Sequence, residues 1–466
     1  MWIYTSLSKW RLFASDKYAA TLIFVTAAML RMVPELAAYP YPIGYDVINY
    51  YIPVVAHFEQ HWPVAASQFP LYVIILHFVN LATGLSAHSI VAAMAIVMFG
   101  VFGMSLYFLA RSLLKLDIDQ SIFLAAFVIF QMAVLRTAWD LHKDIFAITW
   151  MMFAFSLIGR RTAGWKGIAP IVVLTALTVA SDRMIGMLFC ISLAASALAM
   201  RNRTNALYAA ISSSLFAILV IASNIANGGT TIIDAAASEK TPSYYNPENL
   251  LILFAVVNGL LLPAGVIGFV HTKNAMLLKV PLIVSLVASF SWLGFADNSV
   301  LVADRWTVLA GIFVSVFASY GILHMVRKLK LRLAITGSVL AAFAAIGLAY
   351  AAMPHDSPFI LYGIARSSIE KFVPATMQFN SLDIDDNTKL LSTITWINKN
   401  TESDAVIVGE KHWRGFMDVY LKDQRTYRPS SLPYPPAKDF QKQGQSVYWI
   451  QIDNNSPAMF VVLKQQ

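Results

Sequence analysis

The run Phe69-Pro-Leu-Tyr-Val-Ile-Ile-Leu-His-Phe-Val-Asn-Leu81 decides how the chain is threaded through a membrane. It is apolar, yet shorter than the roughly 20 residues that a spanning helix needs. If it spanned, the basic clusters of the chain would alternate between the two sides of the membrane. If it lies along the surface as an interfacial helix opened by Pro70, every basic cluster falls on one side. The sequence therefore predicts an interfacial helix here.

Composition fixes the broad class. Of the 466 residues 58% are hydrophobic and only 13% are charged, and the mean hydropathy is +0.61. These values exclude a soluble globular protein and indicate a polytopic membrane protein. The net charge of +8 does not point to nucleic acid, because the cations fall mostly at the ends of apolar runs. The single cysteine, Cys190, excludes an intrachain disulfide and argues against a metal-thiolate site.

About eleven apolar runs are candidates for spanning helices. The first, Ala19 to Leu30, is followed by Arg31-Met32-Val33-Pro34 rather than by a small-residue cleavage site, so we expect a retained anchor. The others lie at approximately residues 87–110, 120–137, 144–159, 168–181, 184–200, 205–226, 249–270, 276–294, 301–325 and 333–353.

Charge sets the expected orientation. With an interfacial helix at 69–81, one side carries most of the cations, from Lys9 and Arg11 to the cluster at 327–332. By the positive-inside rule that side is cytoplasmic, and so is the amino terminus. An odd number of spans then leaves the carboxyl-terminal tail outside. Most acids before the tail fall on the outer side, where they are raw material for an active site.

The composition changes at about residue 354. We expect a transmembrane domain at 1–353, with a first outer loop at about 32–88, and a small extracytoplasmic α/β domain at 354–466. The tail is predicted to form strands at 405–408, 447–450 and 460–463 and a helix at 388–399. Four prolines between 429 and 436 predict a loop.

Asp46 is the main candidate in the first outer loop. One interpretation is a general base, because Tyr41, Tyr45, Tyr50 and Tyr51 surround it in sequence and could partly desolvate its carboxylate. The other is a helix N-cap, since Asp46 directly precedes a helix-like stretch at 47–60. The spacing of these residues does not decide between a general base and an N-cap.

Two further outer loops gather ionisable groups. The stretch from Arg136 to Asp144 could clamp a phosphate or a sugar, with Lys143 and Arg136 as its cations. In the alternative, Trp139 is an interfacial anchor and Asp140 or Asp144 caps the next helix. The turn Ser181-Asp182-Arg183 favours a structural ion pair for its acid.

Arg305 begins the tenth predicted span at the outer surface. There it either meets an anionic lipid head group as a ligand or snorkels to phospholipid.

Several of these segments together resemble GT-C glycosyltransferases, polytopic enzymes that use polyprenyl-phosphate sugars. The resemblance covers most of the chain and rests on Arg31, the loop Pro42-Ile43-Gly44-Tyr45-Asp46 with Tyr50, the helix opening Gln68-Phe69-Pro70-Leu71-Tyr72 that ends at Gly84, the span ending Tyr107-Phe108-Leu109-Ala110-Arg111, the 135–144 loop and the tail segment Trp396-Ile397-Asn398-Lys399-Asn400-Thr401.

The resemblance implies a reaction. An acid of the first loop is the catalytic base in that family, and only Asp46 fits the position; the resemblance also implies inversion at the sugar. Protein O-mannosyltransferases pair Asp with Glu here, whereas Val47 follows Asp46, and the tail has no Trp-Trp-Asp motif of oligosaccharyltransferases. These departures favour a glycan, a lipid or another hydroxyl over a protein sequon as the acceptor.

The expected partners are therefore a polyprenyl-phosphate sugar donor, such an acceptor and membrane lipids. Lys143, Arg183 and Arg305 are candidates to meet the phosphate, and Tyr45, Tyr50, Asp140 and His142 are candidates for substrate binding. Asp46 and Asp140 could share Mg²⁺ or Mn²⁺, which the sequence leaves open.

Two rival classes remain at this point. A transporter would use the interfacial charges along a permeation path, although most predicted spans lack charges near their middle. A non-catalytic membrane scaffold would keep the fold and lose the chemistry.

Overall fold

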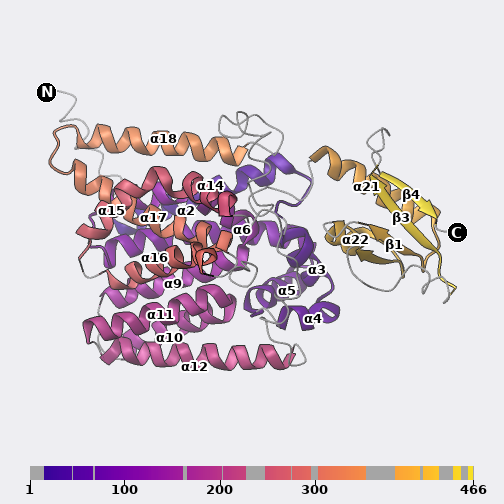
Figure 1. The fold of residues 1–466 in the computed structure, drawn as a ribbon, viewed down its shortest axis with the longest axis horizontal. Coiled ribbons are helices and arrows are strands. Elements are labelled where there is room, and N and C mark those ends of the chain that lie inside the picture. The colour runs from indigo at the N-terminus through magenta and orange to yellow at the C-terminus, as the bar shows by residue number, and fades with distance from the viewer. Residues whose placement is uncertain are drawn as a thin grey trace.

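The computed structural model of the protein describes residues 15–44, 46–66, 69–160, 165–201, 203–226, 247–273, 275–294, 303–352, 384–409, 413–429, 444–452 and 460–464. These residues form a bundle of helices and, beyond one end of it, a small sheet with two flanking helices (Figure 1). The predicted domain boundary near residue 354 lies outside the described residues.

Within the described ranges, seven helices are long and apolar enough to cross a membrane. They are α2 (Asp16–Ala38), α6 (Ala87–Ser112), α11 (Arg183–Met200), α12 (Arg203–Ala226), the stretch Leu250–His271 within α14 (Pro247–Asn258), η4 (Gly259–Leu261) and α15 (Leu262–His271), α17 (Ala303–Val326), and α18 (Arg332–Ala352). They indicate a multi-pass membrane protein.

The predicted span at 120–137 is two helices, α7 (Ile118–Ile129) and α8 (Met132–Asp140), bent by 62°. The Gln131 side chain fixes the bend, because its oxygen accepts from the Val134 N–H at 3.1 Å and its amide donates to the Val257 carbonyl at 3.0 Å. Counted as one broken span, the pair raises the number of candidates to eight, so the predicted eleven are not confirmed.

The three other predicted spans are helices that do not meet the same criterion. α10 (Trp165–Ser181) and α16 (Met276–Ser289) are too short in their apolar part, and α9 (His142–Arg160) is not among the seven candidates although it has 19 residues. α9 packs between α6 and α10, and most of its side chains are buried.

The first loop is more broken than predicted. Instead of one helix at 47–60 it forms the π-helical turn η2 (Val47–Tyr51), then α3 (Ile52–Ala56) and α4 (Phe58–Ala66). Pro53 has no N–H to donate to the Asn49 carbonyl, so a regular α-helix cannot continue through this point. The predicted interfacial helix is α5 (Leu71–Thr83), a helix of 13 residues with Pro70 at its N-cap.

The sheet has the strand order β2-β1-β3-β4, with β1 parallel to β2 and β3 and with β3 antiparallel to β4. Its strands are β1 (Val406–Gly409), β2 (Thr426–Pro429), β3 (Val447–Ile452) and β4 (Phe460–Lys464). β1, β3 and β4 were predicted, as was the helix α21 (Ile384–Asn400). β2 and α22 (Arg414–Tyr420) were not. Pro429 ends β2 at the sheet edge, where a missing N–H costs no ladder bond.

The sheet and its helices pack on the first loop (Figure 1). Side chains of η2, α3 and α5 share one hydrophobic core with side chains of α21, β1 and α22. The Gly415 N–H donates to Asn49 Oδ1 at 3.0 Å, and a Cβ on Gly415 would lie 1.9 Å from the Ile48 carbonyl oxygen. The carboxyl-terminal unit therefore helps to hold the loop that carries Asp46.

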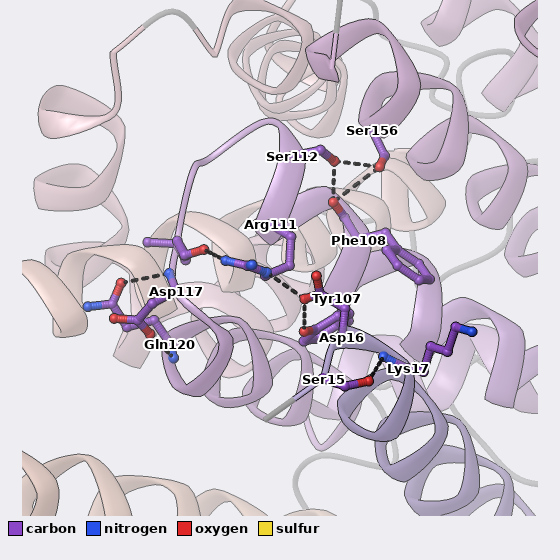
Figure 2. A network of polar contacts seen from close by, with 11 residues as sticks. Ser15, Asp16, Lys17, Tyr107, Phe108, Arg111, Ser112, Asp117, Gln120 and Ser156 are labelled. Atoms are coloured by element: carbon purple, nitrogen blue, oxygen red, sulfur yellow. Dashed lines mark hydrogen bonds and ion pairs between the residues drawn. The ribbon is translucent and has the colours of Figure 1, made fainter. Parts of the chain in front are cut away.

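A polar network ties the opposite end of the bundle together (Figure 2). Asp16 accepts from the Tyr107 hydroxyl at 2.6 Å and from Arg111 Nε at 2.8 Å, which joins α2 to α6. Ser112 and Ser156 lie 2.5 Å apart and join α6 to α9. Both ends of the bundle are thus fixed by contacts between helices that are distant in sequence.

Candidate active site

Gly44 brings the first loop onto the bend at the end of α8. Its φ is +99°, in the region that favours glycine, and a Cβ there would lie 2.6 Å from the Trp139 carbonyl oxygen and 3.0 Å from Asp140 Oδ1. No side chain fits at this position. The glycine of the Pro-Ile-Gly-Tyr-Asp loop is therefore required by close approach of two backbones.

Asp140 holds the loop by its carboxylate. Its Oδ1 accepts from the Asp46 N–H at 2.6 Å, and its Oδ2 lies 2.7 Å from Arg136 Nη2. Asp140 and Arg136 are both almost fully buried. Each charge neutralises the other and the carboxylate also receives an N–H, which offsets part of the cost of burying the pair.

The bend behind the loop is also anchored. Arg31 Nε donates to the Ala138 carbonyl at 3.1 Å, and Arg31 is paired with Glu35 at 2.7 Å. Trp139 is fully buried with its ring centroid 4.5 Å from that of Tyr350, so it is a core residue rather than an interfacial anchor. The backbone that receives Asp46 is thus held from α2 and from α18.

The Asp46 side chain faces a cation. Asp46 stands at the N-cap position of η2, but its backbone is helical (φ −68°, ψ −25°) and its side chain makes no capping hydrogen bond. Its Oδ2 lies 3.7 Å from Arg305 Nη2, and the two side chains keep 21% and 33% of their surface exposed. The carboxylate is therefore free of the capping role and open to a ligand.

Burial, and after it the neighbouring carboxylate of Asp140, raise the pKa of Asp46 to about 6, and the positive charge of Arg305 partly opposes them. A carboxyl group with this pKa is mostly ionised at neutral pH and can still take up a proton readily. These are the properties of a general base.

Tyr50, Tyr51 and Lys143 lie close to Asp46, and His142 stacks on Tyr51. The Lys143 N–H donates to the Tyr51 hydroxyl at 3.2 Å, the Tyr51 and His142 rings stack at 5.1 Å, and Lys143 Nζ lies 6.0 Å from the Tyr50 ring centroid. Burial, together with the charge of Asp46, raises the pKa of Tyr50, so its hydroxyl stays neutral. The neighbourhood therefore offers one ammonium group and neutral ring donors.

Asp182 forms an ion pair, as predicted, and its partner is Lys143. Asp182 caps α11 by accepting from the Ile185 N–H at 2.9 Å, and its Oδ2 lies 3.7 Å from Lys143 Nζ. The Arg183 guanidinium donates to the Ser223 hydroxyl and lies 5.2 Å from the Phe69 ring centroid. Asp182 thus links α11 to Lys143, while Arg183 is directed at α12 and the start of α5.

Of the residues predicted for the site, the structure brings together Asp46, Tyr50, Asp140, His142, Lys143 and Arg305. Tyr45 lies outside the described residues. Gly44 and Tyr51 were not predicted as site residues. The signal for Gly44 was in the sequence, as a glycine two residues before the candidate acid, whereas the contacts of Tyr51 depend on the tertiary fold.

A shared divalent cation does not fit Asp46 and Asp140. Both oxygens of Asp140 already receive donors, from Arg136 and from the Asp46 amide. In the described part of the chain, no three His, Cys, Asp or Glu side chains are grouped so as to hold a metal ion.

Comparison with known proteins gives no family. No protein-family model matches the chain, and no curated protein matches it significantly.

Proposed function

We propose that the protein is a membrane glycosyltransferase that moves a sugar from a polyprenyl-phosphate donor to an acceptor hydroxyl at the outer face of the membrane. In this proposal the amino terminus is cytoplasmic and the carboxyl-terminal unit is extracytoplasmic. The resemblance of the first loop to GT-C enzymes supplies the reaction class and the inversion. The surroundings of Asp46 supply the chemistry.

The main support for this proposal is the environment of the Asp46 carboxylate. The group is held by a rigid loop, has no capping bond, is partly exposed and has a pKa raised to about 6. In the reaction the acceptor hydroxyl attacks the anomeric carbon and gives its proton to Asp46. The bond from that carbon to the phosphate oxygen breaks, and its electron pair leaves on the polyprenyl phosphate. A positioned base typically contributes about 10²–10⁴-fold to such a step.

Cations are needed where the leaving phosphate develops its charge. Arg305 is 3.7 Å from Asp46, and Lys143 is close to Tyr50 and is held by Asp182. When Asp46 takes the proton it loses its negative charge, so Arg305 is released from its ion pair at the moment that the phosphate needs it. Protonation of the base Asp46 and release of the cation Arg305 are thus linked through their ion pair. Arg183 is less suited to this role, because its guanidinium is engaged with Ser223 and Phe69.

The position of the cluster suits a lipid-borne donor. α9, α11 and α17 all begin beside it, since His142, Arg183 and Arg305 lie in their first turns. A donor with its isoprenoid chain among the membrane helices could present its phosphate at these helix ends. The broken helices η2 to α5 and the carboxyl-terminal unit would cover the acceptor side.

The test is reconstitution of the full chain with radiolabelled lipid-linked sugars extracted from cells that lack the gene, in which the donor is expected to accumulate. Asp46→Asn should lower sugar transfer at least 100-fold at unchanged protein abundance, while the exposed Asp119→Asn at the other end of the bundle should retain it. Wild-type turnover by the Asp46→Asn variant would remove this residue from the mechanism. Movement of the lipid-linked sugar across the membrane without cleavage would replace the enzyme by a transporter.

A further inference from the structure

A second polar feature lies at the opposite end of the same helices. A cavity of about 730 Å³, partly open to the surface, is bordered by the ends of α9, α11 and α17, by the starts of α12 and α16, and by the turns after α6 and α15. This volume is in the range of small-molecule binding pockets, roughly 300–1,000 Å³. Its lining combines leucine, isoleucine and methionine side chains with basic ones. The basic residues are Lys115, Arg160, Lys273, Arg327, His271 and His324.

The charge of the cavity is of one sign. Four lysine and arginine residues line it, and no carboxylate is found among the described residues of its lining. Two acids of the polar network at this end are hydrogen-bonded to other residues (Figure 2), and Asp16 also interacts with the charge of Arg160. Asp16 accepts from Tyr107 and Arg111, and Asp117 caps α7 by accepting from the Gln120 N–H at 2.8 Å. Among the described residues, none of the four cations of the cavity is in an ion pair.

The rim of the cavity is held in place. Lys115 has a φ of +57°, which is uncommon for a residue other than glycine, and its Nζ donates to the Gly159 carbonyl at 3.2 Å. The Arg160 guanidinium lies 5.6 Å from the Phe108 ring centroid. The rings of His271 and His324 stack at 4.1 Å and join α15 to α17. These contacts give the rim of the cavity a defined shape.

We infer that this cavity binds a phosphate group, carried either by an anionic lipid or by a small soluble molecule. Phosphate is the anion that several convergent lysine and arginine side chains recognise best. Basic pockets between membrane helices typically receive anionic lipid head groups, and the apolar part of the lining suits the region next to such a head group. The site lies on the side that the charge pattern predicts to be cytoplasmic, and it is independent of the chemistry proposed for Asp46.

Two binding measurements separate the sources of the phosphate. In one, native mass spectrometry follows phosphatidylglycerol titrated onto the purified full chain in neutral detergent. In the other, calorimetry follows sodium pyrophosphate. The double variant Arg160→Gln/Arg327→Gln should weaken binding of at least one probe roughly 25-fold, at about fivefold for each cation. Loss confined to phosphatidylglycerol identifies a lipid site, and loss confined to pyrophosphate identifies a soluble ligand.

A matched control removes the same charge from the same end. Lys328 and Lys330 are exposed, follow α17 and do not line the cavity, so Lys328→Gln/Lys330→Gln should change affinity less than twofold. The charge-retaining variant Arg160→Lys/Arg327→Lys should keep most of the binding, which guards against a folding defect. Equal losses in both glutamine variants, or no loss in either, would show only general attraction to a basic surface and would overturn the site.

Discussion

Replacing Asp46 by Asn should make the folded protein more stable at pH 8 while removing its activity. The pKa of this carboxyl group is raised from 3.8 to about 6, chiefly by burial and then by Asp140. The folded state therefore favours the protonated form more than the unfolded state does. Stability that the group supplies at acid pH is lost as the pH rises from about 4 through about 6. An Asn side chain is uncharged at every pH, like protonated Asp46, so the variant does not lose this stability as the pH rises.

The size of the effect follows from the shift. Each pKa unit corresponds to about 1.4 kcal/mol, so a shift of about two units corresponds to roughly 3 kcal/mol. Because 21% of the side chain is exposed, solvent screens part of this cost, and we expect a gain of about 1–2 kcal/mol at pH 8. At pH 4 the gain should disappear, since wild type is then protonated as well. For a chain of this length such a gain raises the unfolding midpoint by on the order of 2 °C.

The assay is thermal unfolding of the detergent-solubilised chain, followed by tryptophan fluorescence at pH 4, 6 and 8. The exposed Asp119→Asn serves as the control and should show no pH-dependent difference from wild type. A variant that is less stable than wild type at pH 8 would refute the reasoning. It would mean that the 3.7 Å pair with Arg305 outweighs the cost of burying the carboxylate.

Three other predictions concern the same loop. Sugar transfer should decline as the pH falls below about 6, because Asp46 must be ionised to act as the base, and a pH–rate profile without a limb near this value would contradict it. Gly44→Ala should destabilise the fold by about 2–3 kcal/mol more than Gly84→Ala, measured by midpoint shift, because both have positive φ but only the first alanine would collide with neighbouring atoms. Arg136→Leu should cost roughly 3–5 kcal/mol by leaving the Asp140 carboxylate buried without its cation, and the double variant Arg136→Leu/Asp140→Leu should be less destabilised than the sum of the single changes.

Much of the fold was predictable because it follows from local patterns. Apolar runs of sufficient length gave seven helices near their predicted positions, and Pro70 and Gly84 correctly bounded α5. The bend between α7 and α8 was not predictable, because the Gln131 amide that fixes it bonds to a carbonyl on a distant helix. The short strand β2 was not predicted, for a similar reason. Four residues carry little pattern of their own, and the strand is defined by pairing with β1.

The candidate site was predictable in its residue types and not in its pairings. Acids and cations in the predicted outer loops marked Asp46, Asp140, Lys143 and Arg305, because polar groups gathered at one end of apolar helices are raw material for a site. Which acid meets which cation is decided by the packing of helices far apart in sequence. Lys143 rather than the adjacent Arg183 reaches Asp182 at 3.7 Å, and no local rule indicates this choice.

α9 runs between the two polar ends of the bundle, although it is not among the seven candidate spanning helices. Its 19 residues give a length of about 28 Å at 1.5 Å per residue, close to the roughly 30 Å of a hydrocarbon core. It begins with His142 and Lys143 beside Asp46 and ends with Arg160 at the basic cavity. Because α6 and α10 shield it, α9 does not need the apolar surface that lipid demands of an outer helix. A polar first turn is therefore tolerated in α9. This helix connects the proposed catalytic cluster at its start to the proposed phosphate site at its end.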